Sequence, residues 1–197
     1  MTHYYSEKQD SKLNLKQIRI RVKNLDFELY SASGVFSKEK LDKGTEILIK
    51  NSIIKQEWEV LDLGCGIGVI GISVKLLYPK TKVLLSDINE RAIMLSKKNI
   101  ENLKLENIDA IKSDIFSDIK KEFDAILVNP PQTAGKEVCF KIIEESLNHL
   151  KEKGLLQLVA RHKKGGLSLK EKMLSVFGNV RETAKESGFR VYVSEKS

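Results

Sequence analysis

The residues Asn129, Pro130 and Pro131 form a motif that can bind a planar amino group. The lone pair of such an amine is delocalised into a π-system, so the nitrogen is a poor nucleophile. The carboxamide oxygen of Asn129 and the backbone carbonyl of Pro130 can accept its two N–H hydrogens, while Pro131 keeps the backbone rigid. We therefore expect Asn129 and Pro130 to be catalytic residues that orient an amine toward an electrophile that is already activated.

A glycine-rich segment, 62–68, has the composition of a cofactor-binding loop. It reads Asp-Leu-Gly-Cys-Gly-Ile-Gly, and glycines allow the backbone to approach a ligand because they carry no Cβ atom. These glycines alternate strictly, whereas a dinucleotide fingerprint has the spacing Gly-x-Gly-x-x-Gly. We expect the loop to bind a nucleoside-bearing cofactor through Asp62, Gly64, Cys65 and Gly66.

Two further aspartates stand where the next strands are expected to end. An acidic residue at the position of Asp87 can accept hydrogen bonds from the two hydroxyls of a ribose. Asp114 can accept a hydrogen bond from an adenine amino group, with Ile88 and Ile115 against the faces of the ring. Asn129, after the following strand, is expected to border the same cofactor.

The chain from residue 56 onward alternates short apolar runs with helical periodicities, which is typical of βαβ units. The strands are expected at 58–62, 82–87, 109–114, 123–128 and 154–160, and the helices at 69–78, 89–99, 140–154 and 167–177. Two more strands, 180–186 and 189–194, need no crossover helix between them, so one of them can run antiparallel. The predicted fold class is α/β, with a seven-stranded Rossmann-like sheet and an antiparallel last strand.

Residues 1–55 follow a different pattern and are expected to extend the domain formed by 56–197. The runs 17–22 and 26–30 alternate polar and apolar residues, which predicts a half-exposed hairpin. A loop at 33–37 and a helix at 40–54 follow. We expect this extension to cover the face of the domain that holds the active site.

The composition restricts the class of protein and the kind of partner. A chain of 197 residues is long enough for one well-buried core and short for two domains. Its apolar runs fall short of the ~20 residues of a membrane span, and no secretory leader is visible, so we expect a soluble cytoplasmic protein. Two cysteines and three widely spaced histidines predict no metal site.

The net charge of +7 and a pI near 9.2 favour a polyanionic partner. Basic residues gather in the first 55 residues and in the stretch 161–172. The stretch contains Arg161, His162, Lys163, Lys164, Lys170 and Lys172. Two basic flanks around a neutral middle would suit a groove for nucleic acid.

Residues 56–197 resemble the class I S-adenosylmethionine-dependent methyltransferases. The motif Ser-Gly-Val-Phe-Ser-x-x-x-Leu-Asp-x-Gly-Thr at 33–45, together with Asn-Pro-Pro-x-x-x-Gly-Lys at 129–136, is similar to the RsmC-like family of ribosomal RNA guanine-N2 methyltransferases. The resemblance implies S-adenosylmethionine as cofactor and ribosomal RNA as partner. It also implies that Phe36, Ser37, Lys40 and Asp42 border the site. Bacterial members carry a second, degenerate copy of the domain, whereas this chain has one copy and is expected to be a monomer or homodimer.

The acceptor itself is less narrowly defined. Many amino-methyltransferases place an aromatic residue directly after the second proline, and this chain has Gln132 there. Phe36 is the candidate substitute for stacking on the target base, although it could equally anchor the N-terminal hairpin in the core. We expect Phe36, Pro131, Gln132 and Lys136 to contact the substrate. Guanine N2 of small-subunit ribosomal RNA is favoured, and a protein glutamine amide, a small molecule or a non-catalytic RNA-binding module remain alternatives.

Overall fold

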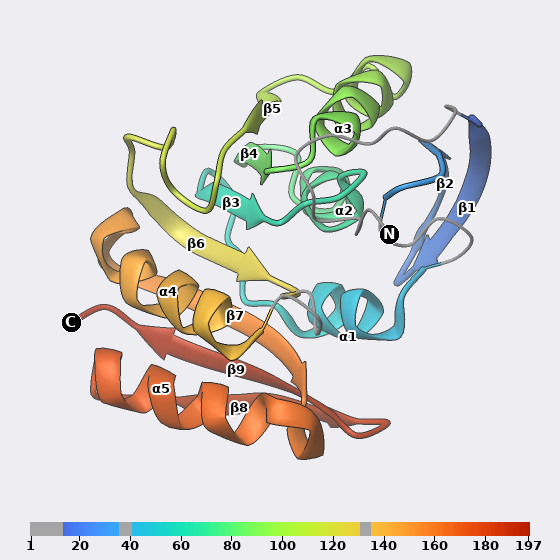
Figure 1. Ribbon diagram of the computed structural model, residues 1–197. Helices are drawn as coiled ribbons and strands as arrows, with labels where there is room; N and C mark the ends of the chain where they lie inside the picture. The colour runs from blue at the N-terminus through green and yellow to red at the C-terminus, as the bar shows by residue number, and fades with distance from the viewer. Residues whose placement is uncertain (1–13, 36–40, 131–134) are drawn as a thin grey trace.

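The computed structural model describes residues 14–35, 41–130 and 135–197 and centres on a seven-stranded sheet (Figure 1). The sheet has the strand order β5-β4-β3-β6-β7-β9-β8. Its strands are β3 (Glu59–Leu63), β4 (Lys82–Asp87), β5 (Ile108–Lys112), β6 (Phe123–Val128), β7 (Leu150–Arg161), β8 (Arg181–Glu186) and β9 (Phe189–Glu195). A separate two-stranded sheet pairs β1 (Lys16–Val22) with β2 (Leu25–Ser31).

The direction of the strands confirms the predicted seven-stranded α/β sheet with a reversed last strand. Strands β3 to β7 pair in parallel, and β9 runs antiparallel to both β7 and β8. The β8–β9 connection is tight because Ser187 and Gly188 both have positive φ, the conformation that two-residue hairpin turns need. A strand returning through such a turn must reverse its direction.

Five helices cover the two faces of this sheet (Figure 1). They are α1 (Lys43–Asn51), α2 (Val69–Leu77), α3 (Glu90–Asn102), α4 (Lys136–Ser146) and α5 (Leu167–Phe177). Successive strand residues point to opposite faces. Val60 therefore joins the hydrophobic cluster that contains residues of α1, α2 and α3, whereas Leu61 joins the cluster under α4 and α5. The central parallel strands β3 and β6 are buried on both sides, as is typical of βαβ folds.

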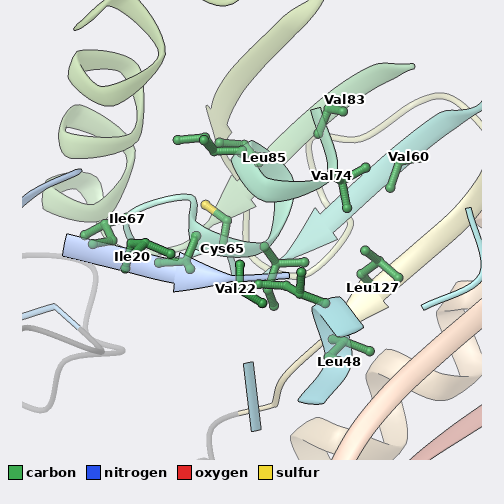
Figure 2. Packing of buried hydrophobic residues seen from close by; sticks show 14 of the residues in the cluster. Ile20, Val22, Leu48, Val60, Cys65, Ile67, Val74, Val83, Leu85 and Leu127 are labelled. Carbon is green, nitrogen blue, oxygen red and sulfur yellow. The ribbon is translucent and has the colours of Figure 1, made fainter. Parts of the chain in front are cut away.

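The N-terminal hairpin packs behind the glycine-rich loop. Figure 2 shows Ile20 and Val22 of β1 among the same buried side chains as Cys65 and Ile67. The Asn99 side chain of α3 accepts a hydrogen bond from the Tyr30 backbone N–H at 2.7 Å and donates one to its carbonyl at 3.1 Å. Within the extension 1–55, which was expected to cover the active-site face, the hairpin packs against α2 and α3.

Several element boundaries differ from the sequence-based expectation, among them those of α4 and α1. Helix α4 was expected to run to Gly154, but it ends at Ser146 and passes through a 3₁₀ turn, Leu147–His149. Leu150 is fully buried at the start of β7, opposite Phe123 of β6. An apolar residue at the end of a helix and one at the start of a buried strand give the same periodic signal. Helix α1 also begins later than expected, at Lys43, because Asp42 caps it and accepts the Thr45 backbone N–H.

Across the described ranges, no helix combines the length and apolar character that crossing a bilayer requires. In the same part of the chain, no group of three or more His, Cys, Asp or Glu side chains is arranged to hold a metal ion.

Candidate active site

The carboxyl ends of the parallel strands border a cavity of about 510 Å³. Each strand from β3 to β7 contributes a residue at or just past its carboxyl end, and β9 contributes Phe189 at its start. Open α/β sheets bind ligands at this edge, where the connecting loops and helix N-termini meet. The volume lies within the roughly 300–1,000 Å³ of small-molecule sites.

The glycine-rich loop forms one wall of this cavity. Gly64 and Gly66 have φ values of 74° and 56°, and a Cβ atom at either position would face open space. The loop is tied to the next strand because the Gly64 and Cys65 backbone N–H groups both donate to the Ser86 carbonyl, at 2.8 and 2.9 Å. Backbone therefore faces the cavity at two positions where a side chain would narrow it.

Asp62 lies directly behind the loop and is fully buried. Its Oδ2 accepts the Gly71 backbone N–H of α2 at 2.8 Å, whereas Oδ1 has no hydrogen-bond partner among the described residues. Burial raises the pKa of Asp62 to about 7, and the charge of Asp87 adds to the shift. Asp62 is not among the residues that line the cavity, so its predicted role in cofactor binding stays a prediction.

Asp87 lines the cavity at the end of β4. Its carboxylate accepts the Gly66 backbone N–H at 2.8 Å and the Asn89 backbone N–H at 2.9 Å. Burial raises the pKa of Asp87, and these hydrogen bonds oppose the shift. Asn89, where this helix was expected to begin, also caps α3 by accepting the N–H groups of Arg91 and Ala92. The bonds fix the carboxylate at the position predicted for ribose binding.

The end of β5 supplies the far wall. Asp114 is exposed and lines the cavity together with Ile88 and Ile115, which are half-buried. The two isoleucines follow neighbouring strands, β4 and β5. The structure thus brings together the three residues predicted to surround an adenine, and their contact with such a ring stays a prediction.

Asn129 enters the cavity from the end of β6 and is held by the start of α1. Its Nδ2 donates to Asp42 Oδ2 at 3.0 Å and to Thr45 Oγ1 at 2.9 Å. A carboxylate only accepts hydrogen bonds, so the atom beside Asp42 must be the amide nitrogen. Both amide hydrogens are therefore occupied, and no described residue donates to Oδ1. The carboxamide oxygen remains available as an acceptor.

The other predicted site residues fall into two groups. Pro130 lines the cavity, whereas Cys65 and Lys136 do not. The Cys65 thiol lies 3.8 Å from Ser96 Oγ in the core, and Lys136 lies 5.0 Å from the Phe140 ring on α4. The predicted substrate residues Phe36, Pro131 and Gln132 lie outside the described residues, as do Ser37 and Lys40.

Several residues of the site were not predicted from the sequence. Arg161 and Phe189 line the cavity, with the guanidinium 4.7 Å above the ring. Val138 and Ile142 of α4 also line it. Arg161 could have been predicted as a site residue, because it stands at the end of an expected parallel strand, where such sheets bind ligands. Phe189 can be assigned to the site only when the direction of β9 is known.

The strand order, the reversed last strand and a glycine loop opposite paired strand-end aspartates define the fold of class I methyltransferases. Residues 26–193 match the family model of the methyltransferase small domain. The chain therefore belongs to the methyltransferase small domain family, whose members use S-adenosylmethionine.

Curated relatives from bacteria match most of this chain. The Bacillus subtilis protein YbxB, itself uncharacterized, is 39% identical over 98% of both chains. Ribosomal RNA small subunit methyltransferase C of Psychromonas ingrahamii is 35% identical over 90% of this chain and 51% of its own. The chain thus spans about half the length of that relative.

Two solved structures share the fold. One is the Thermus thermophilus 16S rRNA N2 G1207 methyltransferase, RsmC, in complex with AdoMet and guanosine. It has a TM-score of 0.82 and 21% identity, and the match covers 96% of this chain and 52% of that one. A methyltransferase from Pyrococcus furiosus has a TM-score of 0.67 and 21% identity over 76% of this chain and 80% of its own.

Proposed function

We propose that this protein transfers the methyl group of S-adenosylmethionine to the N2 amine of a guanine in small-subunit ribosomal RNA. The observation that carries the proposal is that Asn129 and Pro130 line the same cavity as the glycine loop, Asp87 and Asp114. An amine acceptor and a nucleoside cofactor can therefore meet within one cavity.

The residues on the cofactor side fit S-adenosylmethionine. Gly64 and Gly66 leave open space beside the loop, and the unpaired Asp62 Oδ1 can balance the ammonium of its methionine part. Asp87 would bind the ribose, and Asp114 with Ile88 and Ile115 would surround the adenine, because all four line the cavity. When bound, the cofactor supplies a methyl group activated by a positively charged sulfur.

The residues on the acceptor side orient a weakly nucleophilic nitrogen. Asn129 Oδ1 and the Pro130 carbonyl would accept the two N–H hydrogens of the amine and direct its lone pair at the methyl group. As the nitrogen gains the methyl group, the bond from that methyl group to sulfur would break and S-adenosylhomocysteine would leave. The methylated nitrogen would then release one proton to solvent water, and the two acceptors stabilise the positive charge that develops on it. The two hydrogen bonds from Asn129 Nδ2 to Asp42 and Thr45 keep the acceptor oxygen in position before the substrate arrives.

Ribosomal RNA is the substrate that the comparisons and the charge favour. Relatives that share about a third of their residues with this chain are named for a methyltransferase of the small ribosomal subunit. One structure that shares the fold, with a TM-score of 0.82, was solved with guanosine as well as AdoMet. A net charge of +7 suits a polyanionic substrate.

The experiment is a transfer assay with methyl-labelled S-adenosylmethionine, small-subunit ribosomal RNA and ribosomal proteins as separate acceptors. We expect label in the RNA fraction, and we expect Asn129→Ala to abolish transfer while calorimetry still detects cofactor binding. Label in the protein fraction alone would indicate a glutamine amide acceptor. Transfer by Asn129→Ala at the wild-type rate would contradict the role of the carboxamide.

A further inference from the structure

The basic stretch 161–172 divides into two parts in the structure. Lys170 lies 2.7 Å from Glu182, and Lys172 pairs with Glu144. These two lysines are balanced by carboxylates and add little to the local potential. The surplus charge of the stretch therefore lies in its first four residues, at the turn between β7 and α5.

Three cations of this turn have no acidic partner among the described residues. Arg161, Lys163 and Lys164 are all exposed. The nearby acidic groups are already paired: Glu182 has Lys170, Lys185 and Arg190 within 3.6 Å, and Glu186 lies 2.6 Å from Lys43. An uncompensated cluster of cations on one short turn attracts anions from solution.

The turn is also held in a fixed position. The His162 backbone N–H donates to the Gly188 carbonyl at 3.0 Å, and the His162 Nδ1 lies 2.8 Å from the hydroxyl of buried Tyr192. A Cβ atom on Gly166 would lie 2.7 Å from the Arg161 carbonyl, so the backbone folds closely on itself. The turn is thus anchored to β9 rather than free in solvent.

This anchored turn stands at the mouth of the cavity. Arg161 lines the cavity, and its guanidinium lies over Phe189, which lines it too. Strands β6 and β7 pair in parallel with Val128 opposite Leu158. Asn129 directly follows β6, and Arg161 is the last residue of the neighbouring β7. A nucleotide whose base reaches Asn129 would therefore place its flanking backbone near the turn.

We infer that the turn 161–164 is a binding surface for the phosphodiester backbone of the RNA that flanks the target nucleotide. Lysine ammonium groups bind phosphates as point charges without reading sequence, and such contacts fix the register of the nucleic acid. This inference rests on the proposed function, because it takes RNA as the substrate. It assigns Lys163 and Lys164 to substrate positioning outside the cavity.

The test compares two double variants with equal loss of charge. Lys163→Gln/Lys164→Gln removes the surface, whereas Lys80→Gln/Lys120→Gln removes two exposed lysines near the amino ends of β4 and β6, at the opposite edge of the sheet. RNA binding is followed by fluorescence anisotropy of a small-subunit ribosomal RNA fragment between about 50 and 200 mM salt. Thermal unfolding of both variants confirms that they fold.

We expect the dissociation constant for RNA to rise about ten-fold in Lys163→Gln/Lys164→Gln at low salt. Each lost phosphate contact should also lower the slope of log K against log salt by about 0.7, the value for single strands. The control variant should retain most of the wild-type affinity. Equal affinities and equal slopes in the two variants would overturn the inference, as would an absence of RNA binding by the wild type.

The methyl-transfer assay separates this inference from the proposed function. If the wild type binds RNA through the turn and transfers label only to protein, the proposed function fails and the surface stands. If the wild type methylates guanine and the Lys163→Gln/Lys164→Gln variant binds RNA as tightly as the control variant, the surface fails and the proposed function stands.

Discussion

Replacing Asp42 tests whether the orientation of Asn129 is imposed by the start of α1. Asp42 Oδ2 accepts both the Thr45 backbone N–H, at 2.9 Å, and Asn129 Nδ2, at 3.0 Å. Asp42→Ala removes both bonds and leaves Thr45 Oγ1 as the remaining tie on the amide. A hydroxyl can donate as well as accept, so Thr45 alone does not distinguish the amide nitrogen from its oxygen.

The expected loss of kcat follows from the strength of the hydrogen bond between Asn129 and Asp42 that is removed. A hydrogen bond to a charged group contributes about 1.5–3 kcal/mol, and about 1.4 kcal/mol corresponds to a factor of ten in a rate. Because Asn129 Oδ1 is proposed to act only when correctly oriented, kcat should fall between about ten-fold and one hundred-fold in Asp42→Ala. The lost helix cap should also lower the unfolding free energy by about 1 kcal/mol.

Asp42→Asn tests whether an acceptor oxygen at this position is sufficient for both the helix cap and the orientation of Asn129. Asparagine keeps an oxygen that can accept from Thr45 and Asn129, and it is as good a cap as aspartate. We expect Asp42→Asn to recover the stability in full and most of the kcat, measured by single-turnover methyl transfer at saturating RNA and cofactor. A wild-type kcat in Asp42→Ala, or equal losses in both variants, would refute the idea that Asp42 orients Asn129.

Two further changes test the same site from other directions. A Cβ atom at Gly44 would lie 3.2 Å from Asn129 Oδ1 and 3.1 Å from Asp42 Oδ2. Gly44→Ala should therefore lower kcat about ten-fold by displacing the Asn129 amide. The thermal midpoint should be preserved, because alanine has a higher helix propensity than glycine. An unchanged kcat would show that the Asn129 amide tolerates the crowding. Burial raises the pKa of Asp62 to about 7, so the folded protein binds this proton more tightly than the unfolded chain does. The unfolding free energy of the wild type, relative to Asp62→Asn, should then fall as pH rises from about 4 to about 7, by up to about 4 kcal/mol in denaturant titrations. A pH-independent difference between the two proteins would place the pKa of Asp62 near its ordinary value.

Much of the fold could be predicted because its signals are local. The apolar run at 123–128, the glycine loop and the N-cap at Asn89 each lie within a few residues of the element that they specify. Because the carboxyl ends of parallel strands lie at the same edge of the sheet, Gly64, Asp87, Asp114 and Asn129 are expected to lie together at that edge. Local periodicity did not separate the end of α4 from the start of β7, because Leu150 is buried in either structure.

The hydrogen bond that holds Asn129 to Asp42 could not be predicted from local signals. Asp42 and Asn129 are 87 positions apart, and their contact depends on how α1 packs beside the end of β6. The family resemblance implied that Asp42 borders the site, but its hydrogen bond to Asn129 follows from tertiary packing. The same holds for Phe189, which reaches the cavity because β9 runs antiparallel to β7. Neither spacing nor residue type along the chain contains that information.

The identity of the methylated nucleoside tests the central claim most directly. Small-subunit ribosomal RNA is incubated with the protein and S-adenosylmethionine that carries a heavy-isotope methyl group, digested to nucleosides and analysed by mass spectrometry, with Asn129→Ala in parallel. The proposed function predicts labelled N2-methylguanosine with the wild type and none with the variant. Label on another nucleoside, or RNA without label beside a labelled protein fraction, would contradict it.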